Sequence, residues 1–449
     1  MSTTTTTTTT QEKGFEVAIV GGGIAGVILA ISLARRNVPF TIYEKAHAFA
    51  ELGVGLGMSP NAVRAMRFCD PAVREAFEEV TGPPIPWSFL DGTSGDTDST
   101  IQFALGDSVE SMRGCHRGQF LKRLVALLPE DGGGGGSGDG SGGAIRFGKQ
   151  LVRVEEPRGV AGRLVMVFDD GTTAETDAVV GCDGIKSTTR AMVVGEDHPS
   201  AKCTYTHKYA YRGLVPMAQA VEILGPERTA ISGVWMSHDA HFVSYPVAGR
   251  TMLNVIAHCT AREDWPSETQ LTLPADMESC VRDIERLSPS LKRVIQSLKG
   301  VDKWGQFDLG KHPPPTYAKG RICLMGDAAH ASTPHQGAGG GICIEDAAVM
   351  ASLLAADGVG PGAAVEAAFA TFDAHRRRRG EWLVESSRRA GQLFELKSEH
   401  GRDFEKVGAE LKAAAETLWG FRVEDNIRQA VEDLRRRLEG LGERSAAKL

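Results

Sequence analysis

The fold is decided by the stretch Val17-Ala18-Ile19-Val20-Gly21-Gly22-Gly23-Ile24-Ala25-Gly26. Its first four residues predict a short buried strand, and the apolar run Ile24–Arg35 predicts the helix that follows the turn. A second strand is predicted at Phe40–Tyr43. A strand, a tight turn, a helix and another strand within about thirty residues form the repeating unit of a parallel sheet.

Three glycines of this stretch have the G-x-G-x-x-G spacing of a dinucleotide-binding turn. Gly21 permits the tight turn, Gly23 lets a pyrophosphate approach the backbone, and Gly26 lets the helix pack on the strand. Glu44, at the end of the second strand, is placed to accept hydrogen bonds from ribose hydroxyls. We therefore predict that these four residues bind a nucleotide; a purely structural glycine turn is the alternative.

The apolar run Phe15–Ala34 also has the length and position of a signal peptide or membrane anchor. Glu16 interrupts its start, no basic stretch precedes it, and three glycines lie in its middle. A buried strand, turn and helix therefore explain it better. No other stretch is long and apolar enough to cross a bilayer, so we expect no stable membrane association.

Length and composition restrict the class of protein. A chain of 449 residues is too long for one compact core and suits two closely packed domains. Its 42% hydrophobic and 24% charged residues are typical of a soluble globular protein, and the net charge of −7 argues against a nucleic-acid binder. The eight cysteines contain no C-x-x-C pair, which favours a reducing, cytoplasmic compartment. No His, Asp or Glu cluster has metal-ligand spacing, so we expect no metal site.

Two segments have low complexity. Met1–Thr10 is nearly all threonine and is expected to be disordered. Asp131–Gly143 is almost pure glycine, serine and aspartate, and we interpret it as an enlarged surface loop. After it, Leu164–Phe168, a turn and a strand that ends at Ala178–Gly181 predict a hairpin.

The pattern changes in the second half of the chain. Alternating segments between residues 204 and 306, such as His241–Pro246, predict strands of a mixed or antiparallel sheet. A buried parallel strand is predicted again at Arg321–Met325, and a long helical region follows. The basic run His375–Arg379 lies in that region, and we interpret it as a solvated helix face.

Two further motifs follow predicted strands. The first is Asp183-Gly184-x-x-Ser187-x-x-Arg190, and the second is Gly326-Asp327, followed by Pro334 and Gly337-x-Gly339-Gly340-Gly341. An aspartate before glycine is commonly a turn residue or a helix cap. Here an acid at a strand end recurs beside a helix start, which is an arrangement that binds phosphates and polar oxygens.

These three motifs, in this order, resemble those of the single-component FAD-dependent aromatic hydroxylases over about residues 15–440. The segments Glu51-x-Gly53-x-Gly55-x-Gly57, His116-Arg117 and Tyr211-Arg212-Gly213 resemble the salicylate-hydroxylase-like branch. The segments His207-Lys208-x-x-x-Arg212-Gly213-Leu214 and Tyr245-Pro246-Val247 more closely resemble fungal monooxygenases that dearomatise polyketide phenols, as in tropolone biosynthesis.

Pattern and resemblance together predict an α/β fold. A dinucleotide-binding parallel-sheet domain is interleaved with a mixed β-sheet substrate domain and followed by a helical C-terminal segment. We expect a disordered tail at 1–14, a discontinuous FAD-binding domain at 15–200 and 307–370, a substrate-binding sheet domain at 201–306, and a helical region at 371–449.

The resemblance implies roles for five further cofactor residues. Gly57 and Arg117 would contact the ribityl and pyrophosphate region of FAD. Asp327 would bind the ribityl chain, and Gly340 would present its backbone to the isoalloxazine end. Asp183 would lie at the junction used by FAD and by the passing nicotinamide nucleotide.

The resemblance also implies the reaction. NADH or NADPH reduces FAD, O2 adds at flavin C4a, and the resulting hydroperoxide hydroxylates an electron-rich ring. The expected substrate is a small phenol of the resorcinol type, with or without dearomatisation. Decarboxylative hydroxylation of salicylate is the alternative within the family. A two-electron dehydrogenase or a non-catalytic flavin-binding protein are alternatives outside it.

Arg212 and Tyr245 match the pair that holds the substrate phenolate in the dearomatising branch. A guanidinium stays charged in a dry pocket and donates hydrogen bonds in a fixed fork; a structural ion pair is the alternative for Arg212. His241 shares a strand face with Tyr245 and is a candidate for the substrate pocket, as is Pro334. For His330 and His335 we expect structural hydrogen bonds.

The sequence leaves assembly and location open. The number of chains in the assembly is left open, and a homodimer is the alternative to a monomer. The chain ends in Ala447-Lys448-Leu449, a near variant of the Ser-Lys-Leu peroxisomal signal, so the peroxisome is an alternative to the cytoplasm.

Overall fold

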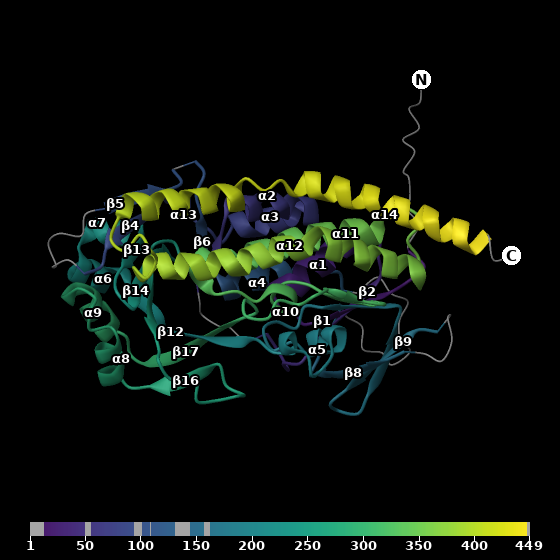
Figure 1. The fold of residues 1–449 in the computed structure, drawn as a ribbon, viewed down its shortest axis with the longest axis horizontal. Helices are drawn as coiled ribbons and strands as arrows, with labels where there is room; N and C mark the ends of the chain where they lie inside the picture. The colour runs from purple at the N-terminus through teal and green to yellow at the C-terminus, as the bar shows by residue number, and fades with distance from the viewer. Residues whose placement is uncertain are drawn as a thin grey trace, which may run out of the picture.

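The computed structural model describes residues 13–49, 55–93, 101–107, 109–130, 144–156 and 162–446, and Figure 1 shows their arrangement. Several sequence predictions fall outside these ranges. They concern the tail Met1–Thr10, Glu51 and Gly53, the segment Asp131–Gly143, and the C-terminal Ala447-Lys448-Leu449.

The nucleotide-binding part is built on a six-stranded sheet with the strand order β18-β19-β11-β1-β2-β7. Its centre is β1 (Val17–Val20), which runs parallel to both of its neighbours. The prediction of a buried parallel unit is therefore confirmed. The other strands are β2 (Phe40–Glu44), β7 (Ile145–Phe147), β11 (Ala178–Gly181), β18 (Ala318–Lys319) and β19 (Ile322–Leu324).

The turn between β1 and α1 (Ile24–Ala34) requires glycine at two positions. Gly21 has a φ of +109°, and a Cβ there would collide with the carbonyl oxygen of Cys182. A Cβ at Gly26 would collide with the carbonyl oxygen of Gly21. The side-chain-free turn thus lets α1 lie directly on the sheet.

The predicted hairpin divides between two sheets. A small antiparallel sheet contains β8 (Leu151–Glu155), β9 (Leu164–Phe168) and β10 (Thr173–Thr176), whereas β11 belongs to the parallel sheet. The division occurs at Asp177, whose carboxylate accepts a hydrogen bond from the backbone of Glu16 at 2.9 Å. This contact turns the chain toward β1 and ends the hairpin.

The second large sheet has eight strands in the order β16-β17-β12-β15-β14-β13-β4-β5. The antiparallel strands predicted between residues 204 and 306 are present in it. Two strands of this sheet, β4 and β5, come from the range 15–200, which was predicted for the FAD-binding domain. They are part of the sheet because β4 pairs in parallel with β13. The bounds are β4 (Trp87–Asp91), β5 (Ile101–Leu105), β12 (Thr204–Pro216), β13 (Ser232–Met236), β14 (Ala240–Val247), β15 (Met252–Thr260), β16 (Thr272–Ala275) and β17 (Val301–Asp308).

The two faces of this sheet have different partners. One face buries Tyr211, Trp235 and Phe242 in a core shared with the helices α6 (Met217–Leu224) and α9 (Pro289–Gln296). The opposite face, called here the pocket face, carries Arg212 and Tyr245. Side chains alternate along a strand, so neighbours in the sequence lie on opposite faces.

Helices connect and cover the two sheets. The long α12 (Ala363–Phe394) runs beneath both α13 and α14 along the molecule (Figure 1). In the part of the chain that is described, no helix combines the length and the apolar stretch needed to cross a bilayer. Other elements are α2 (Pro60–Cys69), α3 (Pro71–Glu78), α4 (Arg117–Val125), α5 (Thr188–Val194), α7 (Pro226–Ala230), α8 (Met277–Asp283), α10 (Asp327–His330), α11 (Gly339–Ala355), α13 (Phe404–Trp419), α14 (Val423–Ala446), β3 (Gly55–Met58), β6 (Arg113–His116), η1 (Pro199–Ala201) and η2 (Pro334–Gln336).

The interpretation of His375–Arg379 as a solvated face is wrong. Arg376 is fully buried, and its guanidinium donates to Glu345 and Asp346 of α11 at 2.8 Å each. Arg379 also donates to Glu345, at 3.0 Å. The two arginines are three residues apart and share the side of α12 that packs on α11, whereas Arg378 is exposed.

Candidate active site

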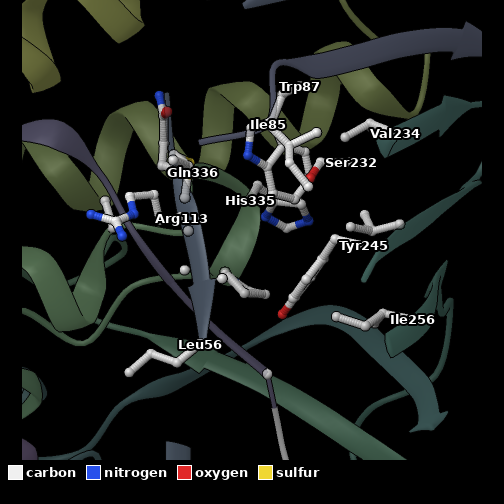
Figure 2. Close-up of a pocket in the computed structure, with 18 of the residues that line it drawn as sticks. Leu56, Ile85, Trp87, Arg113, Ser232, Val234, Tyr245, Ile256, His335 and Gln336 are labelled. Atoms are coloured by element: carbon white, nitrogen blue, oxygen red, sulfur yellow. The ribbon is translucent and has the colours of Figure 1, made fainter. Parts of the chain in front are cut away.

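A cavity of about 380 Å³ lies between the pocket face of the eight-stranded sheet and the glycine-rich loops of the nucleotide-binding part. This volume is in the range of small-molecule sites. Figure 2 shows Trp87, Ser232, Tyr245 and Ile256 of the sheet on one side and Leu56 and His335 on the other. Among the residues predicted to be functional, those that line the cavity are Gly57, Arg212, His241, Tyr245, Asp327, Pro334 and Gly340.

The turn after β1 forms an open cradle at the start of α1. A Cβ at Gly23 would meet no atom within 4 Å, so the backbone there is accessible to a ligand. The Glu44 carboxylate accepts hydrogen bonds from the backbone N–H of Gly22 at 2.7 Å and of Ala46 at 2.8 Å. An accessible helix N-terminus beside a fixed carboxylate fits the pyrophosphate and ribose of a dinucleotide.

A second cradle opens into the cavity itself. Asp327 is exposed at the start of α10, and its carboxylate forms no hydrogen bond within the described residues. Gly340 belongs to the first turn of α11, and Gly57 of β3 lines the same cavity. A free carboxylate and a helix N-terminus facing one space can bind the polar chain and one end of a planar ring.

The structure gives Asp183 a local structural role. Its carboxylate accepts hydrogen bonds from the hydroxyls of Ser187 and Thr189 at 2.6 Å each. It also accepts from the backbone N–H of Thr188 at 2.8 Å and of Thr189 at 3.0 Å. These bonds hold the first turn of α5, and Asp183 does not line the cavity. Contact with a nicotinamide nucleotide remains a prediction.

Arg212 presents a half-buried positive charge to the cavity. Its guanidinium carbon lies 3.5 Å from the ring centroid of Trp304, and its Nε is buried without a hydrogen-bond partner. Burial lowers the pKa of Arg212 to about 10, with a smaller contribution from nearby Arg117, so the group stays charged at neutral pH. Within the described ranges it pairs with no carboxylate, which argues against a structural ion pair. Arg117 itself does not line the cavity.

Tyr245 is 7% exposed and lies beside Trp87, with 5.7 Å between the ring centroids. Figure 2 shows its ring reaching into the cavity. A Cβ at Gly55 would collide with the Tyr245 hydroxyl, so this glycine leaves room for the ring. Burial raises the pKa of the hydroxyl, which therefore remains protonated and can donate a hydrogen bond.

Strand register brings Arg212 and Tyr245 to one cavity. Arg212 on β12 and Val243 on β14 both pair with Ile256 on the strand between them. Tyr245 is two residues beyond Val243 and so lies on the same face. The prediction that these two residues share a site is consistent with this geometry.

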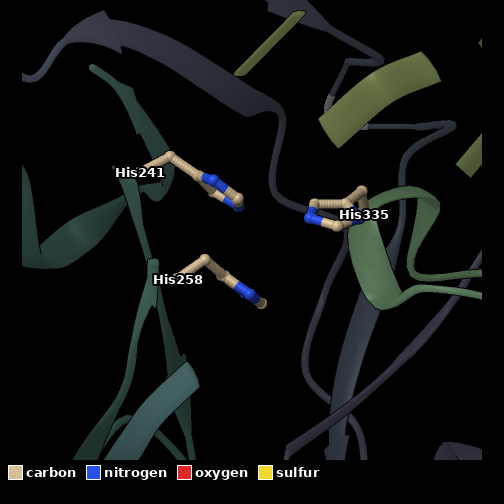
Figure 3. A group of neighbouring side chains, drawn as sticks. All are labelled: His241, His258 and His335. Atoms are coloured by element: carbon tan, nitrogen blue, oxygen red, sulfur yellow. The ribbon is translucent and has the colours of Figure 1, made fainter. Parts of the chain in front are cut away.

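Three histidines, called here the histidine niche, lie together at the cavity wall: His241, His258 and His335. His241 and His258 are register partners, with parallel rings 4.4 Å apart, and Figure 3 shows His335 facing them from η2. The expected structural hydrogen bond of His335 is wrong, because both of its ring nitrogens are buried without a partner. By contrast, His330 Nε2 lies 2.6 Å from the Asp346 carboxylate, as expected for a structural contact.

His258 is not among the residues predicted from the sequence, although the sequence contains a signal for it. The two predicted strands flank a turn at Gly249 and Arg250. Folding the chain about that turn places position 258 opposite 241, as the observed register does. Metal-ligand spacing was absent because the three histidines come from separate segments.

Comparisons with known proteins give one consistent result. A family model described as FAD binding domain matches residues 135–387, and one for an NAD(P)-binding Rossmann-like domain matches residues 19–50. The FAD-dependent monooxygenase pigN of Monascus ruber is 42% identical over 96% of this chain and 99% of its own. Salicylate hydroxylase asL1 of Sarocladium schorii is 35% identical over 96% and 93%. A solved salicylate hydroxylase substrate complex is 27% identical, with a TM-score of 0.77 over 93% of this chain and 98% of that chain.

Proposed function

This chain belongs to the FAD-dependent monooxygenase family, and we propose that it hydroxylates a small phenol, which Arg212 and Tyr245 hold as the phenolate. The observation that carries this proposal is the guanidinium of Arg212, which faces the cavity without a carboxylate partner in the described structure. A partly desolvated cation without a counter-ion favours a ligand that brings the opposite charge. A phenolate is an anion of suitable size and shape.

FAD would be held by the cradle at Gly23 and Glu44 and by the second cradle at Asp327 and Gly340. When bound, it takes electrons from NADH or NADPH and transfers one oxygen atom of O2 to the substrate. The residues fit this cofactor because each cradle places the N-terminus of a helix beside a carboxylate, and the position at Gly23 is open.

The protein has to make the ring electron-rich. A phenol has a reference pKa of about 10, so ionisation near neutral pH requires stabilisation of the phenolate. Arg212 supplies a fixed positive charge in a partly dry cavity, where electrostatic stabilisation is stronger than in water. Tyr245, protonated because its pKa is raised, donates a hydrogen bond to the same oxygen or to a neighbouring one. The ionised ring is then a better nucleophile at carbon.

The second candidate is decarboxylative hydroxylation of a salicylate. A curated relative and a solved structure are both named salicylate hydroxylase. Arg212 pairs with a carboxylate as readily as with a phenolate. The two candidates differ in their products, since decarboxylation releases carbon dioxide, whereas dearomatising hydroxylation keeps every carbon.

The test uses the protein loaded with FAD and a panel of resorcinols, acylphenols and salicylates. Phenol-dependent oxidation of NADH or NADPH is followed by absorbance, and one labelled oxygen atom from 18O2 is expected in the product. Product mass then separates a retained carbon skeleton from loss of carbon dioxide. A protein that binds FAD but whose NAD(P)H oxidation no phenol or salicylate accelerates would contradict the proposal.

A further inference from the structure

The histidine niche is enclosed and small. One ring nitrogen from each of His241, His258 and His335 lies within 4.8 Å of the others. The centre of a triangle with such sides is at most about 2.8 Å from each corner, which is hydrogen-bond distance. Phe394 covers the ring of His241 at 5.4 Å between centroids. A single oxygen atom between the rings would therefore find polar partners on more than one side.

The niche lacks the partners that buried polar groups normally have. Both ring nitrogens of His335 and Nε2 of His241 are buried without a hydrogen-bond partner, whereas Nδ1 of His241 faces the Glu395 carboxylate at 3.7 Å. Buried side-chain nitrogens are hydrogen-bonded in most proteins, so these unpartnered atoms are available to a polar group of a ligand. Burial lowers the pKa of all three imidazoles, which are therefore neutral and each offer one donor and one acceptor.

The outer side of the niche is firmly built. The side-chain amide nitrogen of Gln306 lies 2.6 Å from Nδ1 of His258. The buried carboxylate of Glu395 lies 3.7 Å from Nδ1 of His241 and is itself held by Lys208 and Lys397. These contacts occupy the Nδ1 side of both rings and leave each Nε2 for a ligand.

A metal ion fits this arrangement poorly. A bound metal lies close to the plane of each imidazole and about 2.0–2.1 Å from its nitrogen. The rings of His241 and His258 are parallel within 9° and 4.4 Å apart, so they share no such plane. Hydrogen bonds are longer and tolerate a broader range of directions.

We propose that the histidine niche is a second subsite of the cavity, which binds an uncharged oxygen substituent, a hydroxyl or a carbonyl, of the same phenol. The proposal rests on the proposed function. His258 and Ile256 lie two residues apart on one face of β15, and Ile256 pairs with Arg212. One part of the cavity is therefore cationic and suits the phenolate, and an adjacent part is neutral and suits a neutral oxygen.

This arrangement defines the substrate class. A ring that carries a phenol and a second hydroxyl or a carbonyl group satisfies both parts. A carboxylate would be desolvated among three neutral imidazoles, near the carboxylate of Glu395, and gains no positive charge from the niche itself. The niche thus favours resorcinols and acylphenols over salicylates.

The experiment measures the dissociation constants of two ligands that differ by one hydroxyl, 3-methylphenol and 5-methylresorcinol. Binding to the FAD-loaded protein is followed by the change in flavin absorbance. The wild type is expected to bind 5-methylresorcinol about tenfold to a hundredfold more tightly, which corresponds to one buried hydrogen-bonding group. In His335→Leu the dissociation constants of the two ligands are expected to differ by less than about threefold. His335→Gln is expected to retain part of the preference for 5-methylresorcinol.

His335→Leu removes no hydrogen bond present in the described structure, so folding is expected to be retained and is checked by thermal unfolding. If it is not retained, His335→Ala replaces it with the same measurement. The matched control is His312→Leu, outside the cavity, for which the ratio of the wild type is expected.

An unchanged ratio in His335→Leu overturns the subsite. A zinc ion bound in the niche would also overturn it. That result would be one equivalent of zinc in wild-type protein purified without chelator and none in His335→Leu purified in the same way. A wild type that oxidises NAD(P)H with phenols but binds both ligands equally also overturns it, and leaves the proposed function standing. A wild type that responds to no phenol contradicts the proposed function itself.

Discussion

The guanidinium carbon of Arg212 lies 3.5 Å from the ring centroid of Trp304, across the pairing of β12 with β17. Stacking on an aromatic face stabilises the charge and leaves the edge of the guanidinium free to donate hydrogen bonds. The stack also fixes the plane of the group, so little side-chain entropy is lost when an anion binds. Trp304 of β17 thus holds the guanidinium of Arg212 in a fixed orientation.

Replacing Arg212 by lysine keeps the positive charge but removes the stacking of the guanidinium on Trp304 and its paired N–H donors. We expect kcat/KM for the phenol to fall about a hundredfold, since a charge-assisted, desolvated contact is worth about 2–4 kcal/mol. FAD content is expected to stay equal to that of the wild type, because the proposed cofactor cradles lie on other elements. Steady-state oxidation of NAD(P)H and the flavin absorbance of the purified protein measure the two quantities.

The control for this substitution is Arg282→Lys. Arg282 lies on α8 and bonds the Ser279 hydroxyl at 3.0 Å, on the side of the sheet that faces away from the cavity. Its variant is expected to retain the activity of the wild type. Wild-type kcat/KM in Arg212→Lys would remove Arg212 from the proposed site.

Tyr245→Phe removes only the hydroxyl that faces the cavity. We expect the affinity for the phenol to fall about tenfold, the effect of one hydrogen bond to a charged oxygen. Thermal stability is expected to be nearly unchanged, because the described structure gives this hydroxyl no protein partner. Titration of the phenol against flavin absorbance measures the affinity.

Tyr211→Phe is the matched control for Tyr245→Phe. The Tyr211 hydroxyl donates to Asp283 at 2.8 Å on the opposite face of the same sheet. This variant is expected to lose stability and keep the affinity for the phenol. Equal affinities of the wild type and Tyr245→Phe would show that the hydroxyl does not contact the substrate.

Local patterns in the sequence were sufficient for part of the fold. The sequence predicts the strand Val17–Val20 with its observed bounds, because a buried parallel strand is apolar throughout. Glu44 was placed at the end of the second strand by spacing alone. The proposed role of Arg212 and Tyr245, in contrast, rests on a family resemblance, since an arginine or tyrosine on a strand has many structural uses.

Contacts between segments that are distant in the sequence could not be predicted from local patterns. Nothing near Trp87–Asp91 in the sequence indicates that this strand joins β13, which follows more than a hundred residues later. The burial of Arg376 and Arg379 likewise depends on the acidic pair Glu345 and Asp346 of another helix. A run of arginines has the same local pattern whether its partner is solvent or a buried carboxylate.

That buried network predicts a large effect on stability. Arg376→Met leaves the buried Asp346 carboxylate without its arginine partner and the buried Glu345 carboxylate with Arg379 alone. The free energy of unfolding is expected to fall by about 3–5 kcal/mol, as for other broken buried ion pairs. Urea unfolding measures this change. Arg378→Met, the exposed neighbour on the same helix, is the control and is expected to change stability by less than about 0.5 kcal/mol.

The same network predicts a pH dependence. Burial alone would raise the pKa of Asp346, but the charges of His330 and Arg376 outweigh it and lower the pKa from 3.8 to about 2. A carboxyl with a depressed folded-state pKa contributes stability that is complete above about pH 4 and is lost as the pH falls toward 2. The difference in unfolding free energy between wild type and Asp346→Asn should therefore shrink as the pH falls from 4 toward 2. A difference that stays constant or grows between pH 4 and pH 2 would contradict this assignment.

Asp183 and Asp327 follow similar strands in the sequence, yet their carboxylates have different surroundings in the structure. Asp183 accepts four hydrogen bonds at the start of α5, so Asp183→Ala is expected to lower the unfolding free energy by about 1–3 kcal/mol. Asp327 is exposed in the cavity without a described hydrogen bond, so Asp327→Ala is expected to weaken FAD binding about tenfold or more at unchanged stability of the FAD-free protein. Urea unfolding of the FAD-free protein and titration with FAD measure the two effects. If the two variants exchanged these effects, Asp183 rather than Asp327 would be the cofactor ligand.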